Sequence, residues 1–441
     1  MIHSFQINAL NIVLDVGSGS VHVVDEETAA VLKKLEKVEF DLLDLPKLLE
    51  GTPPDITKAI LALTENGSLF SPVPKIEQEN SIRQVKALCL HMAHECNLSC
   101  IYCFAGQGHY SDPDRGLMSF DVGKKAIDFL IASSGNRRNL EIDFFGGEPT
   151  LNMDVVKELV LYSKSIENEN SKNFRFTLTT NGTLLDDEII NFANEYMDNV
   201  VISLDGRKET NDKHRTFLDG SGSYEDLLPR LIDFAKKTKT KYYVRGTFTK
   251  YNLDFSKDVI HLMDVGFKNI SVEPVVASAE AEYGITESDL PAIMNEYEHL
   301  AIIMENREEK FFHFEIDLDG GPCLIKKITG CGAGSDYLAV TPKGKLYPCH
   351  QFVSDEKFIV GDVNTGINST DIVKEFAGCN IFKKPECMSC WAMYYCSGGC
   401  MATAYNMNGS IFKPDYVSCE MQKKRIECAL YIYAARQLAR S

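Results

Sequence analysis

The stretch His94-Glu95-Cys96-Asn97-Leu98-Ser99-Cys100-Ile101-Tyr102-Cys103-Phe104 holds three cysteines in the spacing C-x3-C-x2-C, with an aromatic residue directly before the last. Cysteine thiolates are the usual protein ligands of iron–sulfur clusters. Three of them can hold three irons of a [4Fe–4S] cluster and leave the fourth iron open, and a metal site with an open position can bind a further ligand and perform chemistry. The alternative is a structural zinc knuckle that takes three of its four ligands from this stretch.

The composition is that of an ordinary soluble chain. It has 441 residues, of which 44% are hydrophobic and 25% charged, enough for about two or three domains with sizeable cores. No run approaches the roughly 20 apolar residues of a membrane span, and the first residues lack the basic and apolar segments of a signal peptide. We therefore expect a cytoplasmic protein without a membrane partner. The net charge of −17 argues against binding to nucleic acid phosphates.

The cysteines are unevenly placed along the chain. Of the 14 cysteines, four lie between Cys89 and Cys103, none lies between residues 104 and 322, and the other ten lie between Cys323 and Cys428. In a cytosolic chain of this size, so many cysteines favour metal binding over disulfides. The pattern predicts two metal-bearing regions that flank a scaffold without cysteines.

Residues 1–70 have the pattern of a small domain of a β-hairpin and helices. Apolar and polar residues alternate from residue 11 to 25 around the turn at Gly17-Ser18-Gly19, which predicts the hairpin. Apolar residues at helical spacing predict helices at 26–37 and 55–64. The proline-containing, polar stretch 71–84 is typical of a linker.

Residues 85–310 alternate short apolar strands with helical segments, which predicts a parallel sheet. We expect an α/β fold, a partial (β/α)6 barrel that stays open where a full eight-unit barrel would close. The six expected strands are 87–92, 140–145, 174–179, 200–204, 242–248 and 270–276. The expected helices are 120–133, 155–166, 187–196, 224–236, 257–265 and 290–305. Residues 311–441 read as a cysteine-rich, loop-rich region that ends in a helix at 422–438.

Polar or glycine-containing motifs follow the predicted strands, at the end of a βα barrel where active sites collect. They are Gly146-Gly147-Glu148-Pro149 after the second strand, Thr180-Asn181-Gly182 after the third, Ser203-Leu204-Asp205-Gly206 after the fourth and Val272-Glu273-Pro274 at the sixth. Each motif alone is a weak signal. Their order after the cysteine loop makes them a strong one together.

The C-terminal region carries a second cysteine pattern. Cys331, Gly344 and Cys349 form C-x12-G-x4-C, and the next run, C-x2-C-x5-C-x3-C followed by one more cysteine after a gap, is made of Cys387, Cys390, Cys396, Cys400 and Cys419. The alternative to iron–sulfur clusters here is a pair of zinc sites, because C-x2-C also suits tetrahedral zinc.

The cysteine loop and the barrel motifs resemble the radical S-adenosylmethionine (SAM) enzymes, in which the amino and carboxylate groups of SAM occupy the vacant iron. The resemblance implies that Cys96, Cys100 and Cys103 hold the SAM-binding [4Fe–4S] cluster. The residues expected to contact SAM are Tyr102, Gly146, Gly147, Glu148, Pro149, Ser203, Asp205 and Arg215. We expect the glycines to let backbone approach the ammonium group and Glu148 to offset its charge.

Among the other expected contacts, Ser203 and Asp205 suit the ribose hydroxyls and Tyr102 the adenine. The forked donors of Arg215 suit the SAM carboxylate. The open alternatives are a solvated surface arginine for Arg215 and a structural turn for Ser203 and Asp205.

The C-terminal pattern resembles the SPASM extension of radical SAM peptide-modifying enzymes, which holds two auxiliary [4Fe–4S] clusters. By that resemblance the outer cluster takes Cys387, Cys390, Cys396 and Cys419, and the inner cluster takes Cys331, Cys349 and Cys400. Seven cysteines cannot fill two four-ligand clusters. Either Cys323 supplies the last ligand, or one iron stays open to bind a substrate thiolate.

The N-terminal pattern resembles the winged-helix domain that binds the leader of ribosomally made precursor peptides as an added strand. As a whole, the chain most resembles the maturases of six-cysteines-in-forty-five-residues (SCIFF) peptides, which join a cysteine sulfur to a carbon of another residue. The resemblance implies reductive SAM cleavage to a 5′-deoxyadenosyl radical, hydrogen abstraction from the peptide and an external flavodoxin or ferredoxin as electron donor. The alternatives are an anaerobic sulfatase maturase that makes formylglycine and a non-catalytic iron–sulfur electron carrier.

Overall fold

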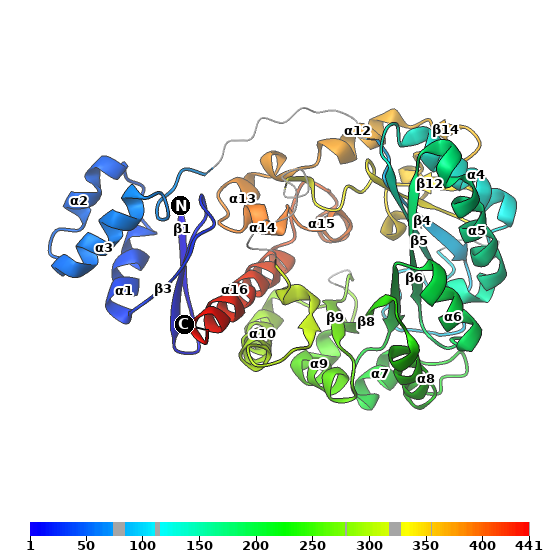
Figure 1. Ribbon diagram of the computed structural model, residues 1–441, viewed down its shortest axis with the longest axis horizontal. Helices are drawn as coiled ribbons and strands as arrows, with labels where there is room; N and C mark the ends of the chain where they lie inside the picture. Colours follow the sequence, from blue (N-terminus) through cyan, green and yellow to red (C-terminus); the bar gives the residue numbers. More distant parts are fainter. Residues whose placement is uncertain (74–83, 111–114, 278–279, 317–327, 354, 441) are drawn as a thin grey trace.

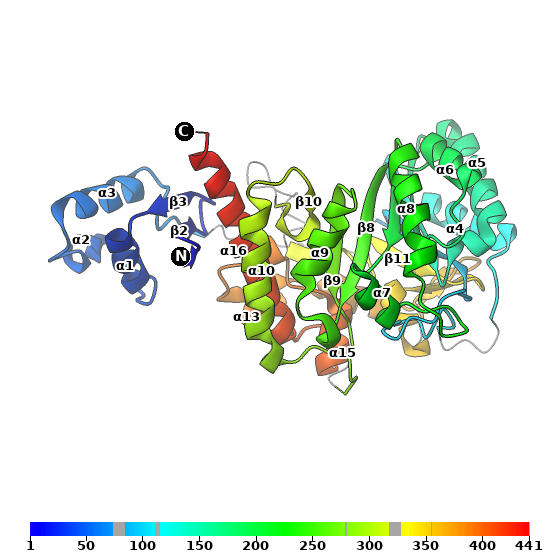
Figure 2. The same cartoon turned by 90° about the horizontal axis from the view of Figure 1, so that it is seen from below.

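The computed structural model describes residues 1–73, 84–110, 115–277, 280–316, 328–353 and 355–440. The N-terminal elements lie at one end of the molecule and a parallel sheet with its helices at the other, with the C-terminal helix α16 (Tyr416–Leu438) between them (Figures 1 and 2). In the described residues no helix is both long and apolar enough to span a membrane.

The N-terminal residues form a three-stranded antiparallel sheet in the order β1-β2-β3, followed by helices. Its elements are β1 Ile2–Ile7, β2 Leu10–Asp15, β3 Val21–Val24, α1 Glu26–Leu35, the 3₁₀ turn η1 Leu42–Asp44, α2 Leu45–Leu48 and α3 Pro54–Glu65. The predicted hairpin is confirmed as β2 and β3. The strand β1 was not predicted, because only Ile2 and Ile7 at its two ends are buried and its polar middle gives no alternating signal.

Six parallel strands with helices packed on one side form the barrel at the end opposite the N-terminal elements (Figure 1). The strands are β4 Ala87–Ala93, β5 Asn139–Gly146, β6 Asn173–Thr180, β7 Asn199–Ser203, β8 Lys241–Phe248 and β9 Asn269–Pro274. The main helices are α4 Phe120–Ser133, α5 Met153–Asn170, α6 Asp187–Tyr196, α7 Lys208–His214, α8 Tyr224–Lys237, α9 Phe255–Asp264 and α10 Leu290–Met304. All six predicted strands and the six predicted helices are present, so the predicted fold is confirmed; the short helix α7 was not predicted.

The strands of this sheet have two different faces. On β6, Phe174, Phe176 and Leu178 are buried and alternate with Arg175, Thr177 and Thr179, which are less buried. Because successive residues of a strand point to opposite faces, the apolar set packs under the helices and the polar set faces the barrel interior. The same alternation recurs on β5 and β8, and it places polar side chains where the strands end.

The C-terminal region extends this sheet at the β4 edge. The strand β11 (Tyr337–Val340) pairs with β4 in parallel, and β12 (Lys345–Tyr347), β13 (Gly361–Asp362) and β14 (Gly366–Ile367) continue it in antiparallel fashion. At the other edge, the two-residue strand β10 (Lys310–Phe311) pairs with β9. In the described residues β4 and β9 do not pair, so the barrel stays open.

The remaining elements are short, apart from α16. They are α12 Thr370–Gly378, α13 Pro385–Met388, α14 Met393–Cys396 and α15 Met401–Asn408, with 3₁₀ turns at Pro149–Asn152, Lys250–Asn252, Glu287–Asp289, Phe312–Phe314, His350–Phe352, Glu356–Phe358 and Ile381–Lys383. The helix α16 begins six residues earlier than predicted, at Tyr416, because the Asp415 carboxylate accepts a hydrogen bond from the Ser418 backbone at 2.8 Å and caps it.

One histidine ties the N-terminal sheet to the C-terminal region. The ring of His3 on β1 stacks on Trp391 with 3.8 Å between centroids. Its Nδ1 lies 3.3 Å from Glu36 and its Nε2 2.9 Å from Glu427 of α16. Burial lowers the pKa of His3, but the hydrogen bonds and charges of the two carboxylates outweigh burial and raise it above 6.5. The protonated ring is therefore the form that holds this junction.

This junction predicts a pH dependence of stability. Because the folded pKa of His3 is raised, its contribution is complete below pH 6.5 and is lost as the pH rises through the folded value. We expect His3→Phe, which keeps the ring stacked on Trp391, to cost about 1–2 kcal/mol below pH 6 and much less at a pH above the folded pKa of His3. Thermal unfolding followed by Trp391 fluorescence measures this. An equal loss at both pH values would contradict the assignment.

Candidate active site

The cysteine loop follows β4 and is held in place by the segment after α7. The backbone N–H of Ser99 donates to the carbonyl of Thr216 at 2.8 Å, and that of Ile101 donates to the carbonyl of His214 at 2.9 Å. Through these bonds two backbone N–H groups of an irregular loop find carbonyl acceptors, as the N–H groups of a strand do. The loop is therefore fixed by a segment more than a hundred residues away in the sequence.

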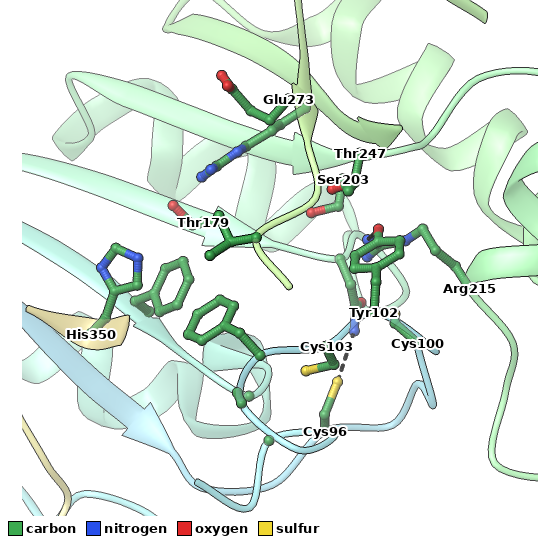
Figure 3. Close-up of a pocket in the computed structure, with 18 of the residues that line it drawn as sticks. Cys96, Cys100, Tyr102, Cys103, Thr179, Ser203, Arg215, Thr247, Glu273 and His350 are labelled. Atoms are coloured by element: carbon green, nitrogen blue, oxygen red, sulfur yellow. Dashed lines mark hydrogen bonds between the residues drawn. The ribbon is translucent and has the colours of Figure 1, made fainter. Parts of the chain in front are cut away.

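Cys96, Cys100 and Cys103 all line one cavity at the ends of the parallel strands (Figure 3). The cavity encloses about 1080 Å³, including its open mouth. Other side chains that line it come from the strand ends and from the C-terminal region; they include Tyr102, Thr179, Ser203, Arg215, Thr247, Glu273 and His350. The structure thus brings together the three cysteines and most of the residues expected to contact SAM.

Binding of an iron–sulfur cluster at this loop would displace the thiol protons of its cysteines. Burial raises the pKa of Cys96 to about 11 and that of Cys100 to about 12, so both are thiols at neutral pH until a metal displaces the proton. The Leu98 N–H lies 3.4 Å from the Cys96 sulfur and the Asn181 amide 3.7 Å from it. Such donors stabilise a thiolate and tune an iron–sulfur site. In the described residues no three His, Cys, Asp or Glu side chains converge as the ligands of a single ion do.

The two glycines after β5 are required by the neighbouring backbone. A Cβ on Gly147 would lie 2.0 Å from the Glu95 carbonyl oxygen, and one on Gly146, whose φ is +126°, would lie 2.5 Å from that of Ala93. Both glycines line the cavity. That the backbone of these glycines also approaches a ligand stays a prediction. The close contact in the structure is between the glycine turn and the residues that lead into the cysteine loop.

The Glu148 carboxylate is fully buried and joins two strand-end loops. It accepts hydrogen bonds from the backbone N–H of Thr150 at 3.0 Å, the hydroxyl of Thr180 at 2.6 Å and the backbone N–H of Asn181 at 2.7 Å. Neither Glu148 nor the buried Pro149 is among the residues that line the cavity. The structure therefore gives Glu148 a role in joining the two loops, and its expected charge contact with an ammonium group stays a prediction.

Asp205 stands behind the cavity and positions two residues that line it. The carboxylate is fully buried and accepts from the Tyr102 hydroxyl at 2.8 Å and the Thr247 backbone N–H at 3.1 Å. The Tyr102 hydroxyl in turn accepts from Arg215 Nη1 at 2.8 Å. Asp205 does not line the cavity, whereas Ser203, at the end of β7, does. In this structure Asp205 supports the tyrosine and, through it, the arginine; the ribose contact expected of it stays a prediction.

Arg215 is a buried residue of the cavity wall, so the alternative of a solvated surface arginine is wrong. It is only 8% exposed, and its Nε has no hydrogen-bond partner in the described part of the chain. An arginine with free donors at a cavity suits a carboxylate.

Seven of the C-terminal cysteines line two neighbouring cavities. Cys387, Cys390, Cys396 and Cys419 line one of about 910 Å³. Cys331, Cys349 and Cys400 line another of about 1510 Å³, which Cys396 and Cys419 also line. The division into an outer and an inner ligand set, which the resemblance implies, stays a prediction. Cys323, the expected extra ligand, lies outside the described residues.

The inner cysteine cavity adjoins the cavity of the cysteine loop. The two share six lining residues, Arg245, Glu273, Pro274, Val276, His350 and Gln351. Sequence reasoning missed Thr179, Thr247 and Arg245; their signal was the alternation of β6 and β8, which points every second residue inward. His350 and Gln351 reach the cavity only because β11 and β12 extend the central sheet.

Comparisons with known proteins agree with this geometry. Residues 90–254 match the model of the radical SAM superfamily. The radical SAM cyclopropyl synthase TigE of Paramaledivibacter caminithermalis is 23% identical over 92% of this chain and 89% of its own. The structure of anSMEcpe with bound AdoMet and the Kp18Cys peptide superposes with a TM-score of 0.65 at 21% identity, covering 80% of this chain and 99% of that one. The structure of Streptococcus suis SuiB bound to its precursor peptide SuiA has a TM-score of 0.55 at 16% identity and covers 95% of this chain and 98% of that one.

The packing at Gly147 predicts a large effect from one methyl group. We expect Gly147→Ala to lower the free energy of unfolding by about 2–4 kcal/mol, because the methyl group meets a backbone carbonyl that cannot move aside. The matched control is Gly378→Ala at the end of α12, where an added Cβ meets nothing within 4 Å. Urea unfolding of both variants measures the difference. Equal stabilities would contradict the close packing of the two loops.

Proposed function

We propose, because residues 90–254 match the model of the radical SAM superfamily, that this chain is a peptide maturase that forms a thioether. Its substrate is a ribosomally made, cysteine-rich peptide, in which a cysteine sulfur is joined to a carbon of another residue. The observation that carries the proposal is that the cavity of Cys96, Cys100 and Cys103 adjoins a second cavity lined by Cys331, Cys349 and Cys400.

In this proposal the residues that line the first cavity have different roles. Bound there, a [4Fe–4S] cluster and SAM supply the reductive cleavage that yields a 5′-deoxyadenosyl radical. Arg215 holds the SAM carboxylate with the donors that the Tyr102 hydroxyl leaves free. Ser203 meets the ribose, and Tyr102, positioned by Asp205, bounds the adenine. Phe104 and Phe145, which also line the cavity, exclude water from a reactive radical.

The adjoining cavity receives the peptide. Its three cysteines hold the inner [4Fe–4S] cluster, and the outer cluster takes the four cysteines of the cavity next to it. With Cys323 absent from the ligand set, one inner iron is open to the substrate thiolate. In this arrangement the residues shared by the two cavities lie between the substrate sulfur and the carbon from which hydrogen is taken. An external flavodoxin or ferredoxin supplies electrons.

The N-terminal sheet supports a substrate with a leader. In the described residues β3 pairs only with β2, so its second edge is free to add a strand. SuiB, whose structure was solved with its precursor peptide, covers 95% of this chain. The alternative of a formylglycine-generating maturase accounts for the barrel and the cysteine cavities but gives the N-terminal sheet no task.

The proposal predicts both a nucleoside and a peptide product. We expect the anaerobically reconstituted protein to release 5′-deoxyadenosine from SAM with dithionite, and Cys96→Ala to release none. Co-expression with a small cysteine-rich peptide encoded nearby is expected to give a peptide lighter by two hydrogen atoms for each cross-link, as read by mass spectrometry. Conversion of cysteine to formylglycine would change the mass differently and would support the alternative. An electron carrier would release no 5′-deoxyadenosine.

The three cysteine cavities predict the iron content. We expect about twelve irons per chain, in three clusters of four. Replacing Cys96, Cys100 and Cys103 together by alanine is expected to leave about eight, because the auxiliary sites do not depend on that loop. Iron analysis and Mössbauer spectroscopy of anaerobic protein measure this. A content near four irons, or zinc in place of iron, would refute the auxiliary sites.

A further inference from the structure

Two arginines face the space between the SAM-type cavity and the inner cysteine cavity. Arg245, on β8, lines both cavities, and Arg425, on α16, lines the inner one. They come from opposite parts of the chain, the barrel and the last helix. Neither belongs to the cysteine sets or to the expected SAM contacts, so their charges need another explanation.

Arg245 presents a free positive charge. It is one of the residues of β8 that point into the barrel, and its side chain lines the cavity. In the described residues its side chain makes no ion pair and no hydrogen bond, whereas that of Arg207, another arginine of the barrel, is paired with Asp258 at 2.8 Å and Asp254 at 3.0 Å. An unpaired arginine inside a protein of net charge −17 is positioned to bind an anion.

Arg425 is held rigidly with one nitrogen left over. It is 7% exposed, and its Nε donates to the Tyr297 hydroxyl at 2.8 Å while Nη1 donates to Gln422 at 3.4 Å. Its buried Nη2 has no partner among the described residues. A buried donor without a partner costs stability, and a ligand that accepts from it removes that cost.

The charge around the two arginines leaves room for one more anion. Glu273 is a carboxylate of the same cavity wall; it accepts from Ser271 at 2.8 Å and lies 3.2 Å from His313. Burial would raise the pKa of Glu273, but His313 and the two arginines hold it well below its usual range. Asp143, on β5, is also near Arg245, but burial raises its pKa to about 7. The two guanidinium groups therefore face one carboxylate that is held ionised and one carboxyl group that burial drives toward its neutral form. Beside them the side-chain oxygen of Gln351 is also buried without a hydrogen-bond partner.

We propose that Arg245 and Arg425 form a binding site for a carboxylate of the substrate peptide, next to the residue that reacts. The inference rests on the proposed function, because it takes a peptide to be the occupant of this cavity. The carboxylate belongs either to an acidic side chain or to a free peptide C-terminus. Paired guanidinium forks recognise either one by charge-assisted hydrogen bonds, which fixes the distance between the acidic group and the reacting carbon.

The test compares matched peptides on the cluster-loaded protein saturated with SAM. The probes are N-acetyl-Ala-Cys-Ala-Asp-Ala-amide, its Asn counterpart, and the Asn peptide with a free C-terminus, each titrated anaerobically by calorimetry. We expect the Asp peptide or the free-terminus peptide to bind at least tenfold more tightly than the Asn amide; which of the two does so identifies the source of the carboxylate. Equal affinities, or no saturable binding of any probe, overturn the proposal.

Variants separate this site from other roles of the arginines. Arg245→Gln and Arg425→Gln are expected to bring the affinity for the charged peptide down to that of the neutral one. Arg425 does not line the SAM-type cavity, so Arg425→Gln is expected to leave iron content and SAM affinity unchanged. Arg245→Gln removes no side-chain hydrogen bond of the described structure. It therefore tests the carboxylate site without the loss of the Tyr297 contact that Arg425→Gln causes. The control is Arg230→Gln, on α8, an arginine about half exposed and 3.5 Å from Asp226, which should change nothing.

A lowered SAM affinity or iron content in the arginine variants, with peptide binding unchanged, would assign the arginines to SAM or to a cluster and overturn the proposal. Release of 5′-deoxyadenosine is recorded on the same samples. If it persists while charged and neutral peptides bind alike, the carboxylate site fails and the maturase proposal stands. If no nucleoside is released, the maturase proposal fails.

Discussion

The close backbone contact between the loop after β4 and the turn after β5 is the constraint on which the site depends. Gly147 donates its N–H to the Ala93 carbonyl at 2.7 Å, and the Glu148 N–H donates to the Glu95 carbonyl at 2.8 Å. Only glycine leaves space for this approach. The three cysteines begin at the next residue, so their placement against the other strand ends follows from how tightly these two loops pack. The buried Glu148 carboxylate then links the pair to the loop after β6.

The polar residues of the site follow from the parallel arrangement of the strands. Because all six strands run in the same direction, their carboxyl ends meet at one edge, and the inward-facing residues near that edge share one cavity. Buried groups behind the wall hold those that face it, as Asp205 holds Tyr102 and, through it, Arg215. By pairing with β4, the strand β11 brings the C-terminal cysteines to the same edge. The inner cysteine cavity therefore adjoins the cavity of the cysteine loop.

The helix α16 connects all parts of the chain. It carries Cys419 at its start, Arg425 against Tyr297 of α10, and Glu427 against His3 of the N-terminal sheet. The N-terminal sheet, the proposed leader-binding site, is therefore connected through α16 to the wall of the inner cysteine cavity. The side chains that make this link are charged, so their strength depends on pH and on salt.

The sequence by itself determined the elements and the chemical classes, because those are local properties. Strand and helix periods identified the six βα units, and cysteine spacing separated the SAM-type loop from the cysteines of the C-terminal region. Only the tertiary structure decided which polar residues face the cavity. It placed Glu148 and Asp205 outside the cavity lining, brought Arg215 into it, and added His350 and Gln351 to the residues that the two cavities share. These outcomes depend on strand order, on the extra strand β11 and on burial, which are set by contacts between residues far apart in the chain, and no local pattern records them.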